Sequence, residues 1–373
     1  MRIHRQAGRT KPANSSRSGR RRRLGAIAAV AAVTVLLSAC SSDSDSSEGG
    51  ELSDVTITIG IQGQPGVFEA SGAWDSAPYK VEFAPFSLPT ENFAANAAGD
   101  VDISDLPVWS GVQGLGALGP NDKVPYQSAT VFLAPHPDKF DPTGFLIASR
   151  QSGIKTLDDI KNHTGAKLKF GYTKKSLQEI YAAKALDYLG LGFDDIESVD
   201  LQYAQLLVAL DAGEIDVLFL PYSTSYKQIK NGAVPVAPIS TFGYVSRWSL
   251  WVNSEAIENP TRKAAIDDAL ARYVDYLTWQ VENPDAVAKA FVEGSNFAPE
   301  AAQRQWEDSR YSVSLVTPEL VSLTQQDVEF AVKVGVLPGS FPVDRFFTHA
   351  FDDAITKALE KSGYPQKLEA SYE

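Results

Sequence analysis

The sequence predicts an α/β fold built as two similar lobes. From residue 54 onward, apolar runs with strand-like alternation are interleaved with helix-like stretches, an order typical of α/β proteins. The six residues 98–103, AGDVDI, also recur 114 residues later as residues 212–217, AGEIDV. Each copy follows a helix-like stretch and leads into a strand that ends in proline, at Pro107 and at Pro221. The repeat therefore favours two related lobes over one long sheet.

The first half of the chain supplies most of the expected strands. Val55 to Ile61 alternate between apolar and polar or small residues, which indicates a strand, and residues 80–86 indicate a second one. A helix is expected from Pro89 to Gly99, because glycine commonly ends a helix. A further strand should follow at DVDIS. Two more apolar runs lie between residues 130 and 149 on either side of a proline-rich turn.

Helices become more frequent along the rest of the chain. Thr156 and Asp159 form a capping-box pattern that should start a short helix, which breaks near Gly165. A strand at KLKFGY and a helix at SLQEIYAAKALDYLGL come next. After Pro260 the expected elements are helices, namely residues 261–282, 284–292, 299–306 and 318–335.

The N-terminal 40 residues have the order of an export signal. A basic cluster, Arg20 to Arg23, precedes an apolar run from Leu24 to about Leu37, and small residues stand before Cys40. This run is too short and wrongly flanked for a spanning helix. The ending Leu-Ser-Ala-Cys resembles the bacterial lipobox, which implies cleavage after residue 39 and lipidation of Cys40. The alternative is a free thiol behind an ordinary signal. If Cys40 is lipidated, residues 40–53 form a lipidated, polar and flexible tether.

Charge excludes one large class of partner. Residues 1–39 hold nine of the 34 Lys and Arg residues and no Asp or Glu, which leaves 25 basic against 46 acidic residues, a net charge of −21. Phosphate contacts need a basic face, so nucleic-acid binding is not expected. With one cysteine no intramolecular disulfide forms, and the fold depends on its core.

Several segments in the same order resemble the nitrate/sulfonate/taurine branch of the solute-binding lipoproteins of ABC importers. They are IGIQGQPG, NFAANAAGDVDISDLP, GFLIASRQSGIKTLDDIKNHTGAKLKFGY, LGLGFDDIESVDLQYAQLLVALDAGEIDVLFLPY and TPELVSLTQQDVEFAVKVGVLP, together with Trp306 and Tyr311. The resemblance implies the two-lobed, type II periplasmic-binding-protein-like fold, with a ligand cleft between lobes that close like a hinge. Two departures stand at expected ligand-facing strand ends, Ser104 before Asp105 and the run Leu220-Pro221-Tyr222.

The expected domains follow from crossings placed near Ser149 and Ser240. Lobe one is residues 54–148 plus 241–373, and lobe two is residues 149–240. The resemblance implies a receptor on the outer face of the cytoplasmic membrane that passes a small solute to an ABC permease. We expect a monomer.

Ligands of open α/β sheets bind beyond the carboxyl ends of the strands. The loops there combine aromatic rings with amides and hydroxyls, which suits a small solute with an apolar body and a polar head. Trp248 is among those aromatic residues. We expect ligand contacts from Gln62, Gln64, Phe86, Ser87, Asp105, Trp109, Tyr172, Lys174, Ser176, Tyr222, Tyr244 and Arg247.

The turn from Tyr172 to Ser176 admits two interpretations. It lies between a strand and a helix, where free backbone N–H groups and two lysines would favour an anion. Ser176 and Glu179 also match a capping box, which would occupy those N–H groups. A sulfonate or similar organic anion fits the first interpretation. A neutral aromatic or a pyrimidine-type thiamine precursor fits the second, with aromatic residues as the site.

Catalysis and cofactors are not expected. The three histidines beyond the signal, His136, His163 and His349, are far apart in sequence, so no metal site is indicated. No G-x-S-x-G elbow is present. The enzyme relative on this fold, the pyrimidine synthase of thiamine metabolism, is expected to need a cysteine-rich iron motif that this chain lacks. A ligand-sensing partner of a signalling receptor is the remaining alternative.

Overall fold

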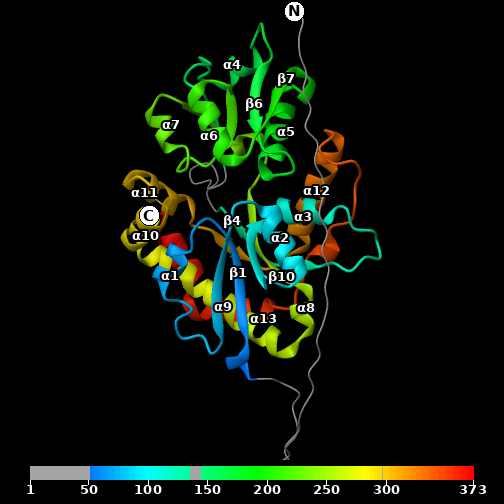
Figure 1. The fold of residues 1–373 in the computed structure, drawn as a ribbon, viewed down its shortest axis with the longest axis vertical. Coiled ribbons are helices and arrows are strands. Elements are labelled where there is room, and N and C mark those ends of the chain that lie inside the picture. Colours follow the sequence, from blue (N-terminus) through cyan, green and yellow to red (C-terminus); the bar gives the residue numbers. More distant parts are fainter. Residues whose placement is uncertain (1–50, 135–143, 296) are drawn as a thin grey trace, which may run out of the picture. The chain divides into compact units, whose positions relative to one another are not determined.

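Two β-sheets with a common strand arrangement form the framework of the protein (Figure 1). The computed structural model describes residues 51–134, 144–295 and 297–373, which belong to one compact unit. The first sheet has the order β11-β4-β10-β3-β1-β2 and the second β7-β6-β8-β5-β9. In each sheet three parallel strands are followed by an antiparallel strand, β10 or β5, which is flanked on its other side by β4 or β9. The predicted α/β architecture is confirmed.

The strands agree with most of the expected positions. Those of the first sheet are β1 (Thr56–Gln62), β2 (Lys80–Phe86), β3 (Ile103–Pro107), β4 (Tyr126–Leu133), β10 (Arg247–Asn253) and β11 (Ser312–Ser314). Those of the second sheet are β5 (Phe145–Ala148), β6 (Leu168–Tyr172), β7 (Ile196–Asp200), β8 (Val217–Leu220) and β9 (Val234–Pro238).

The helices cover the sheets, and their longest run follows β10. Before β10 the chain forms α1 (Gly66–Ser71), α2 (Pro89–Ala98), α3 (Val108–Leu115), α4 (Leu157–Lys161), α5 (Leu177–Leu189), α6 (Tyr203–Ala212) and α7 (Tyr226–Lys230). After β10 it forms α8 (Ser254–Glu258), α9 (Pro260–Glu282), α10 (Pro284–Ser295), α11 (Pro299–Asp308), α12 (Pro318–Lys333), α13 (Asp352–Ser362) and α14 (Tyr364–Ala370). Single turns of 3₁₀-helix are η1 (Leu52–Asp54), η2 (Phe193–Asp195), η3 (Ile239–Phe242) and η4 (Asp344–Phe346).

The alternation that predicts β1 is seen in the core. Ile57, Ile59 and Ile61 are buried and, with a period of two residues, point to the same face of the sheet. There they belong to one hydrophobic cluster with Ile266 and Leu270 of α9. The apolar face of β1 is therefore the surface on which α9 packs.

The repeated six-residue pattern has the same structural role in both sheets. Gly99 and Gly213 end α2 and α6 in the left-handed conformation, with φ of 84° and 74°. The Asp102 carboxylate accepts a hydrogen bond from the Thr58 N–H at 2.9 Å, and the Asp216 carboxylate accepts one from the Lys169 N–H at 2.8 Å. Each aspartate thus fastens its own strand to the neighbouring parallel strand. The repeat therefore marks equivalent corners of two similarly built sheets.

The sheet membership of β5 corrects one expected boundary. We expected the first crossing near Ser149, but β5, which precedes it, pairs with β8 and β9 in the second sheet. The chain therefore changes sheet between Leu133 and Phe145, one strand earlier than expected. It returns between Pro238 and Arg247, the segment that contains Ser240.

Helix α12 contacts elements associated with both sheets. The Asp327 carboxylate on α12 forms an ion pair with Arg247 at the start of β10, and another, at 3.4 Å, with Lys184 on α5. Lys333 at the end of α12 pairs with Asp187 on α5 at 2.9 Å. The pairs with Lys184 and Asp187 join α12 to α5 of the second lobe, and the pair with Arg247 joins α12 to β10 of the first lobe.

The described chain offers no membrane-spanning element, because none of its helices combines the necessary length with apolar character. The expected signal, Cys40 and the tether up to residue 50 lie outside the described residues.

Candidate functional site

The carboxyl ends of the parallel strands bring several expected residues together. Gln62 and Phe86 are register partners at the ends of β1 and β2. The Gln62 side chain is exposed and Phe86 is half-buried. Gln64 and Ser87, in the loops that follow, are also exposed. This edge therefore presents amide and hydroxyl groups beside an aromatic ring.

Asp105 has the most specific environment of the expected residues. It lies two residues before the end of β3, and its carboxylate accepts hydrogen bonds from the Trp248 indole N–H and, at 2.7 Å, from the Tyr273 hydroxyl. Trp248 lies at the start of β10, directly after the returning segment, and Tyr273 lies on α9. Burial raises the pKa of the Asp105 carboxyl to about 6, and these two hydrogen bonds limit the rise.

Aromatic side chains form a layer behind this carboxylate. Tyr273 stacks on Phe132 with ring centroids 5.4 Å apart and makes an edge contact with Tyr276 at 5.3 Å. Phe68, after β1, stacks on Tyr276 at 4.5 Å and lies 6.1 Å from Tyr273. Burial raises the pKa values of Tyr273 and Tyr276 well above 10, so both hydroxyls stay neutral at physiological pH. The layer is therefore apolar apart from hydroxyl groups.

Ser104 does not face the ligand side that we expected. Its hydroxyl donates to the Asn92 side chain at 2.7 Å and accepts from the Asn96 amide at 2.9 Å, both on α2. A Cβ atom on Gly60, the register partner of Ser104, would lie 2.4 Å from Asn92. Ser104 thus completes a buried polar contact with α2, and the alternation of the strand turns Asp105 to the opposite face.

In the turn from Tyr172 to Ser176, side chains accept from the backbone N–H groups. Those of Thr173, Lys174 and Lys175 donate to Gln178, Asp200 and Glu179 respectively, at 2.8–3.1 Å. The Ser176 hydroxyl accepts from the Gln178 N–H and donates to the Thr173 carbonyl. The Lys174 side chain is exposed. These bonds occupy the N–H groups that an anion would need. The expected capping box of Ser176 and Glu179 does not form, because Glu179 accepts from the Lys175 N–H and Ser176 accepts from the Gln178 N–H.

The remaining expected residues are in hydrophobic or ion-paired surroundings. Arg247 is buried against Asp327, with its guanidinium 5.5 Å from the Tyr244 ring centroid. Tyr244 is buried and lies edge-on to Tyr181 at 5.2 Å. Trp109, in the first turn of α3, is buried, and no described side chain or backbone group accepts from its indole N–H. Arg247 is therefore committed to a structural ion pair.

Tyr222 lies at a contact between the second sheet and α11. It makes an edge contact with Phe145 at 5.8 Å, and the Arg304 guanidinium lies 5.3 Å from its ring centroid. Arg304 also pairs with Asp308 at 2.9 Å. One residue after Tyr222, the Ser223 hydroxyl donates to the Gln305 side chain. Since α10 and α11 contact each other and α10 packs on α1 of the first lobe, this contact joins the two lobes.

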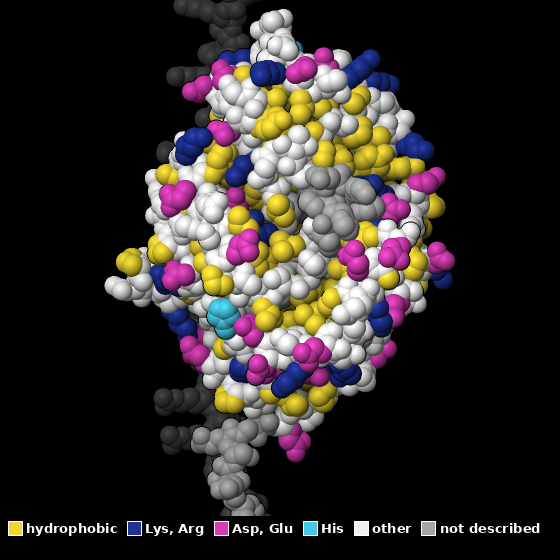
Figure 2. Space-filling model, turned by 180° about the vertical axis from the view of Figure 1, so that it is seen from behind, with side chains coloured by type: hydrophobic (Ala, Val, Ile, Leu, Met, Phe, Trp, Pro, Cys, Tyr) yellow, Lys and Arg dark blue, Asp and Glu magenta, His cyan; other side chains and the backbone are white. Residues whose placement is uncertain are grey.

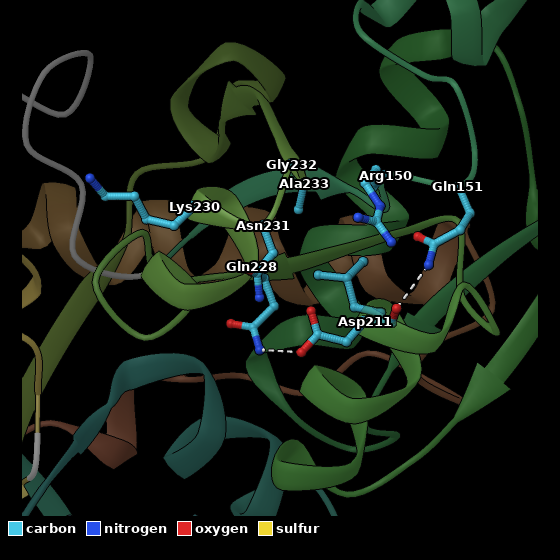
Figure 3. A pocket seen from close by; sticks show the side chains of 9 residues that line it. Arg150, Gln151, Asp211, Gln228, Lys230, Asn231, Gly232 and Ala233 are labelled. Atoms are coloured by element: carbon cyan, nitrogen blue, oxygen red, sulfur yellow. Dashed lines mark hydrogen bonds between the residues drawn. The ribbon is translucent and has the colours of Figure 1, made fainter.

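Two open pockets are separate from the surroundings of Asp105. One of about 480 Å³ is lined by Arg150 and Gln151, which follow β5, and by Asp211, Gln228 and Asn231 (Figure 3). Because β5 is antiparallel to β8, the end of β5 lies beside the beginning of β8. This pocket is therefore at the edge of the second sheet that is away from the carboxyl ends of its parallel strands. A second, of about 550 Å³, is lined by residues that include Tyr172, Phe193 and Lys333.

The described residues contain no group of three or more His, Cys, Asp and Glu side chains able to hold a metal ion. On the face seen in Figure 2, Lys and Arg side chains are scattered among acidic ones, and hydrophobic side chains gather mainly in the upper part. The described surface in this view has no continuous basic stripe of the kind that binds nucleic acid.

Two features of the site were missed from the sequence. Tyr273 was expected only as part of a helix, and Arg304 was not singled out. The aromatic residues of α9, at positions 273 and 276, share one helix face. That spacing was the available signal, but it does not say which strand the helix covers.

Comparison with solved structures identifies the fold. The aliphatic sulphonate binding protein SsuA from Escherichia coli superposes with a TM-score of 0.64 at 15% identity, covering 79% of this chain and 92% of that one. The alkanesulfonate-binding protein SsuA from Xanthomonas axonopodis pv. citri, bound to MOPS, gives 0.65 at 16% identity, covering 80% and 99%. The desulfurization enzyme DszB, as a mutant with biphenyl-2-sulfinic acid, gives 0.56 at 14%, covering 81% and 99%. No protein-family model matches the sequence, and no curated protein is significantly similar to it. The predicted two-lobed periplasmic-binding-protein-like fold of type II is confirmed.

Proposed function

We propose that this protein is the extracytoplasmic solute-binding receptor of an ABC importer. It captures a small organic solute between its lobes by hinge closure and delivers it to a membrane permease, and Cys40 carries the lipid anchor. The observation that carries the proposal is the pair of sheets with one common strand arrangement, whose strand ends gather polar and aromatic side chains. The fold shared with sulfonate-binding proteins supports it.

Binding without chemistry is part of the proposal. The same fold also occurs in the enzyme DszB, so fold alone does not separate receptor from enzyme. The described groups that contact the Asp105 carboxylate are the Trp248 indole N–H and the Tyr273 hydroxyl, both neutral hydrogen-bond donors on aromatic side chains. This composition supports a binding site.

The proposal also concerns the chemical class of the solute. A sulfonate-type anion is what the similar binding proteins suggest, but the two expected cation positions give it little support. Arg247 is paired with Asp327, and the N–H groups beside Lys174 are hydrogen-bonded within the turn. The aromatic surface near Asp105 instead supports a solute with an apolar body.

A thermal-shift screen tests the proposal on the chain without residues 1–40, which keeps the whole compact unit. The panel contains alkyl sulfonates, taurine, nitrate, aromatic acids, pyrimidines and small amines. A ligand at 100 times its Kd should stabilise the folded state by about 2.7 kcal/mol. Chromatography of the recovered ligand should show it unchanged. A stabilising compound that is converted to product would overturn the receptor assignment, as would an identical scattering profile with and without saturating ligand.

A further inference from the structure

Asp105 is a partly buried carboxylate without a cationic partner. Within the part of the chain that the structure describes, no Lys, Arg or His lies at ion-pair distance from it, and its two hydrogen-bond donors, Trp248 and Tyr273, are neutral. An ionised carboxylate offers about four acceptor sites, so acceptor capacity remains after these two bonds. Charges removed from water are normally paired. The Asp105 carboxylate therefore lacks the cationic partner that a charge in such surroundings normally has.

The equivalent place in the second sheet shows what the fold alone would use. The repeat aligns Ile103 with Val217 and Pro107 with Pro221, so Asp105 corresponds to Phe219. Phe219 is 1% exposed and packs edge-on against Tyr181 at 5.6 Å. An apolar side chain thus satisfies this strand position in one copy. The carboxylate in the other departs from the core pattern, and such departures concentrate at functional sites.

Half-buried aromatic rings accompany the carboxylate. Trp248 donates to it, Phe68 lies 6.1 Å from Tyr273, and Tyr311 lies 6.3 Å from Phe132, which stacks on Tyr273. All three are partly exposed, in contrast to the buried ring of Tyr273 behind them. The faces of aromatic rings attract cations, most strongly in desolvated surroundings. Carboxylate and rings together suit a positively charged organic group.

We propose that Asp105 receives a protonated amine of the transported solute, with the half-buried Trp248 ring beside it. This inference rests on the proposed receptor function and names the substrate class, an organic cation or an amine-bearing solute. The negative charge of the chain beyond residue 39 would favour the approach of such a solute. Arg247 and Lys184 do not oppose it, because both are paired with Asp327.

Isothermal titration calorimetry on the chain without residues 1–40 tests the proposal. The probes are small primary and quaternary amines with apolar bodies, among them 2-phenylethylamine, each beside a neutral isostere such as 2-phenylethanol. At least one amine should bind at least about tenfold more tightly than its isostere. Asp105→Asn should abolish that preference, whereas Glu91→Gln, which removes an exposed carboxylate on α2, should preserve it.

The pH dependence supplies a second measurement. The amine stays protonated between pH 5 and pH 8, while Asp105, with its pKa of about 6, loses its charge toward the acidic end. The titratable groups that face it, Tyr273 and Tyr276, stay neutral over this range. Affinity for the amine should be about tenfold weaker at pH 5 than at pH 8 in the wild type and nearly constant in Asp105→Asn.

The outcomes separate this inference from the proposed function. If a sulfonate or neutral compound binds, closes the protein and is unaffected by Asp105→Asn, the amine proposal is wrong and the receptor function stands. If no amine binds more tightly than its isostere, the amine proposal is likewise overturned. If the bound compound is chemically converted, the receptor function itself fails.

Discussion

Replacing Asp105 by Asn should stabilise the unliganded protein at neutral pH. The folded state holds the Asp105 proton up to a pKa of about 6, whereas the unfolded chain releases it near 3.8. Between these values the folded state binds more protons than the unfolded state, so stability falls as pH rises. Asparagine removes this loss. Its amide oxygen can accept from Trp248, and its NH₂ group can donate to the Tyr273 oxygen, so both hydrogen bonds have a counterpart.

The size of the effect follows from the two pKa values. The difference of about two pKa units, at 1.36 kcal/mol each, gives about 3 kcal/mol at pH 7.5. At pH 4.5, where much of the titration in the folded state has yet to occur, the same linkage gives about 1 kcal/mol. With an unfolding entropy of about 2.1 cal/mol/K per residue over about 320 residues, the gain at pH 7.5 raises Tm by about 4 °C.

Urea unfolding of wild type and variant at both pH values measures this difference. Other titrating groups are common to both proteins and cancel in the comparison. A stability difference that is the same at pH 4.5 and pH 7.5 would refute the reasoning, because only a shifted Asp105 pKa makes it pH-dependent. Tyr273→Phe is the matched control. It removes a hydrogen bond that lowers the Asp105 pKa, so its stability relative to wild type should worsen as pH rises.

Three further predictions concern other parts of the chain. Asp327→Ala should destabilise the protein by about 3–5 kcal/mol in urea unfolding, because it leaves the buried Arg247 charge unpaired. The control Asp187→Ala, at an exposed ion pair, should cost less than about 1 kcal/mol, and equal costs would contradict a structural role for the Arg247–Asp327 pair. Ser223→Ala removes a hydrogen bond to α11 that joins the two lobes, so small-angle scattering of the unliganded variant should give a larger radius of gyration. An unchanged radius would show that this hydrogen bond does not hold the lobes together. Cys40→Ser should move the protein from the membrane fraction to the soluble fraction, and continued membrane association would exclude Cys40 as the anchor.

Features that depend on neighbouring residues were predictable from the sequence. The capping box of Thr156 and Asp159 forms as expected, with both reciprocal hydrogen bonds, because its partners are three residues apart. Gly99 and Gly213 end their helices for an equally local reason, since glycine adopts positive φ at low cost. The boundary at β5 was wrong because its sheet depends on partners more than 60 residues away in sequence, β8 and β9.

The candidate site was only partly predictable for the same reason. The strand-end rule selected Asp105, but its partner Tyr273 is 168 residues away, and the sequence does not state which strand α9 covers. Trp248 was among the expected aromatic residues, whereas Tyr273 and Tyr276 were expected only as part of a helix. Their arrangement behind one carboxylate required the packing of α9 on the sheet.

Charge type and charge availability are separate properties, and only the first can be read from a sequence. Arg247 was expected to reach a ligand, yet Asp327, 80 residues further on, neutralises it in the interior. At the turn that holds Lys174, Asp200 and Glu179 accept from the backbone N–H groups that an anion would need. Asp105 differs because the described fold gives it neutral donors and no cation. The charged group that the fold leaves unneutralised is therefore the better guide to the ligand, and at this site that group is negative.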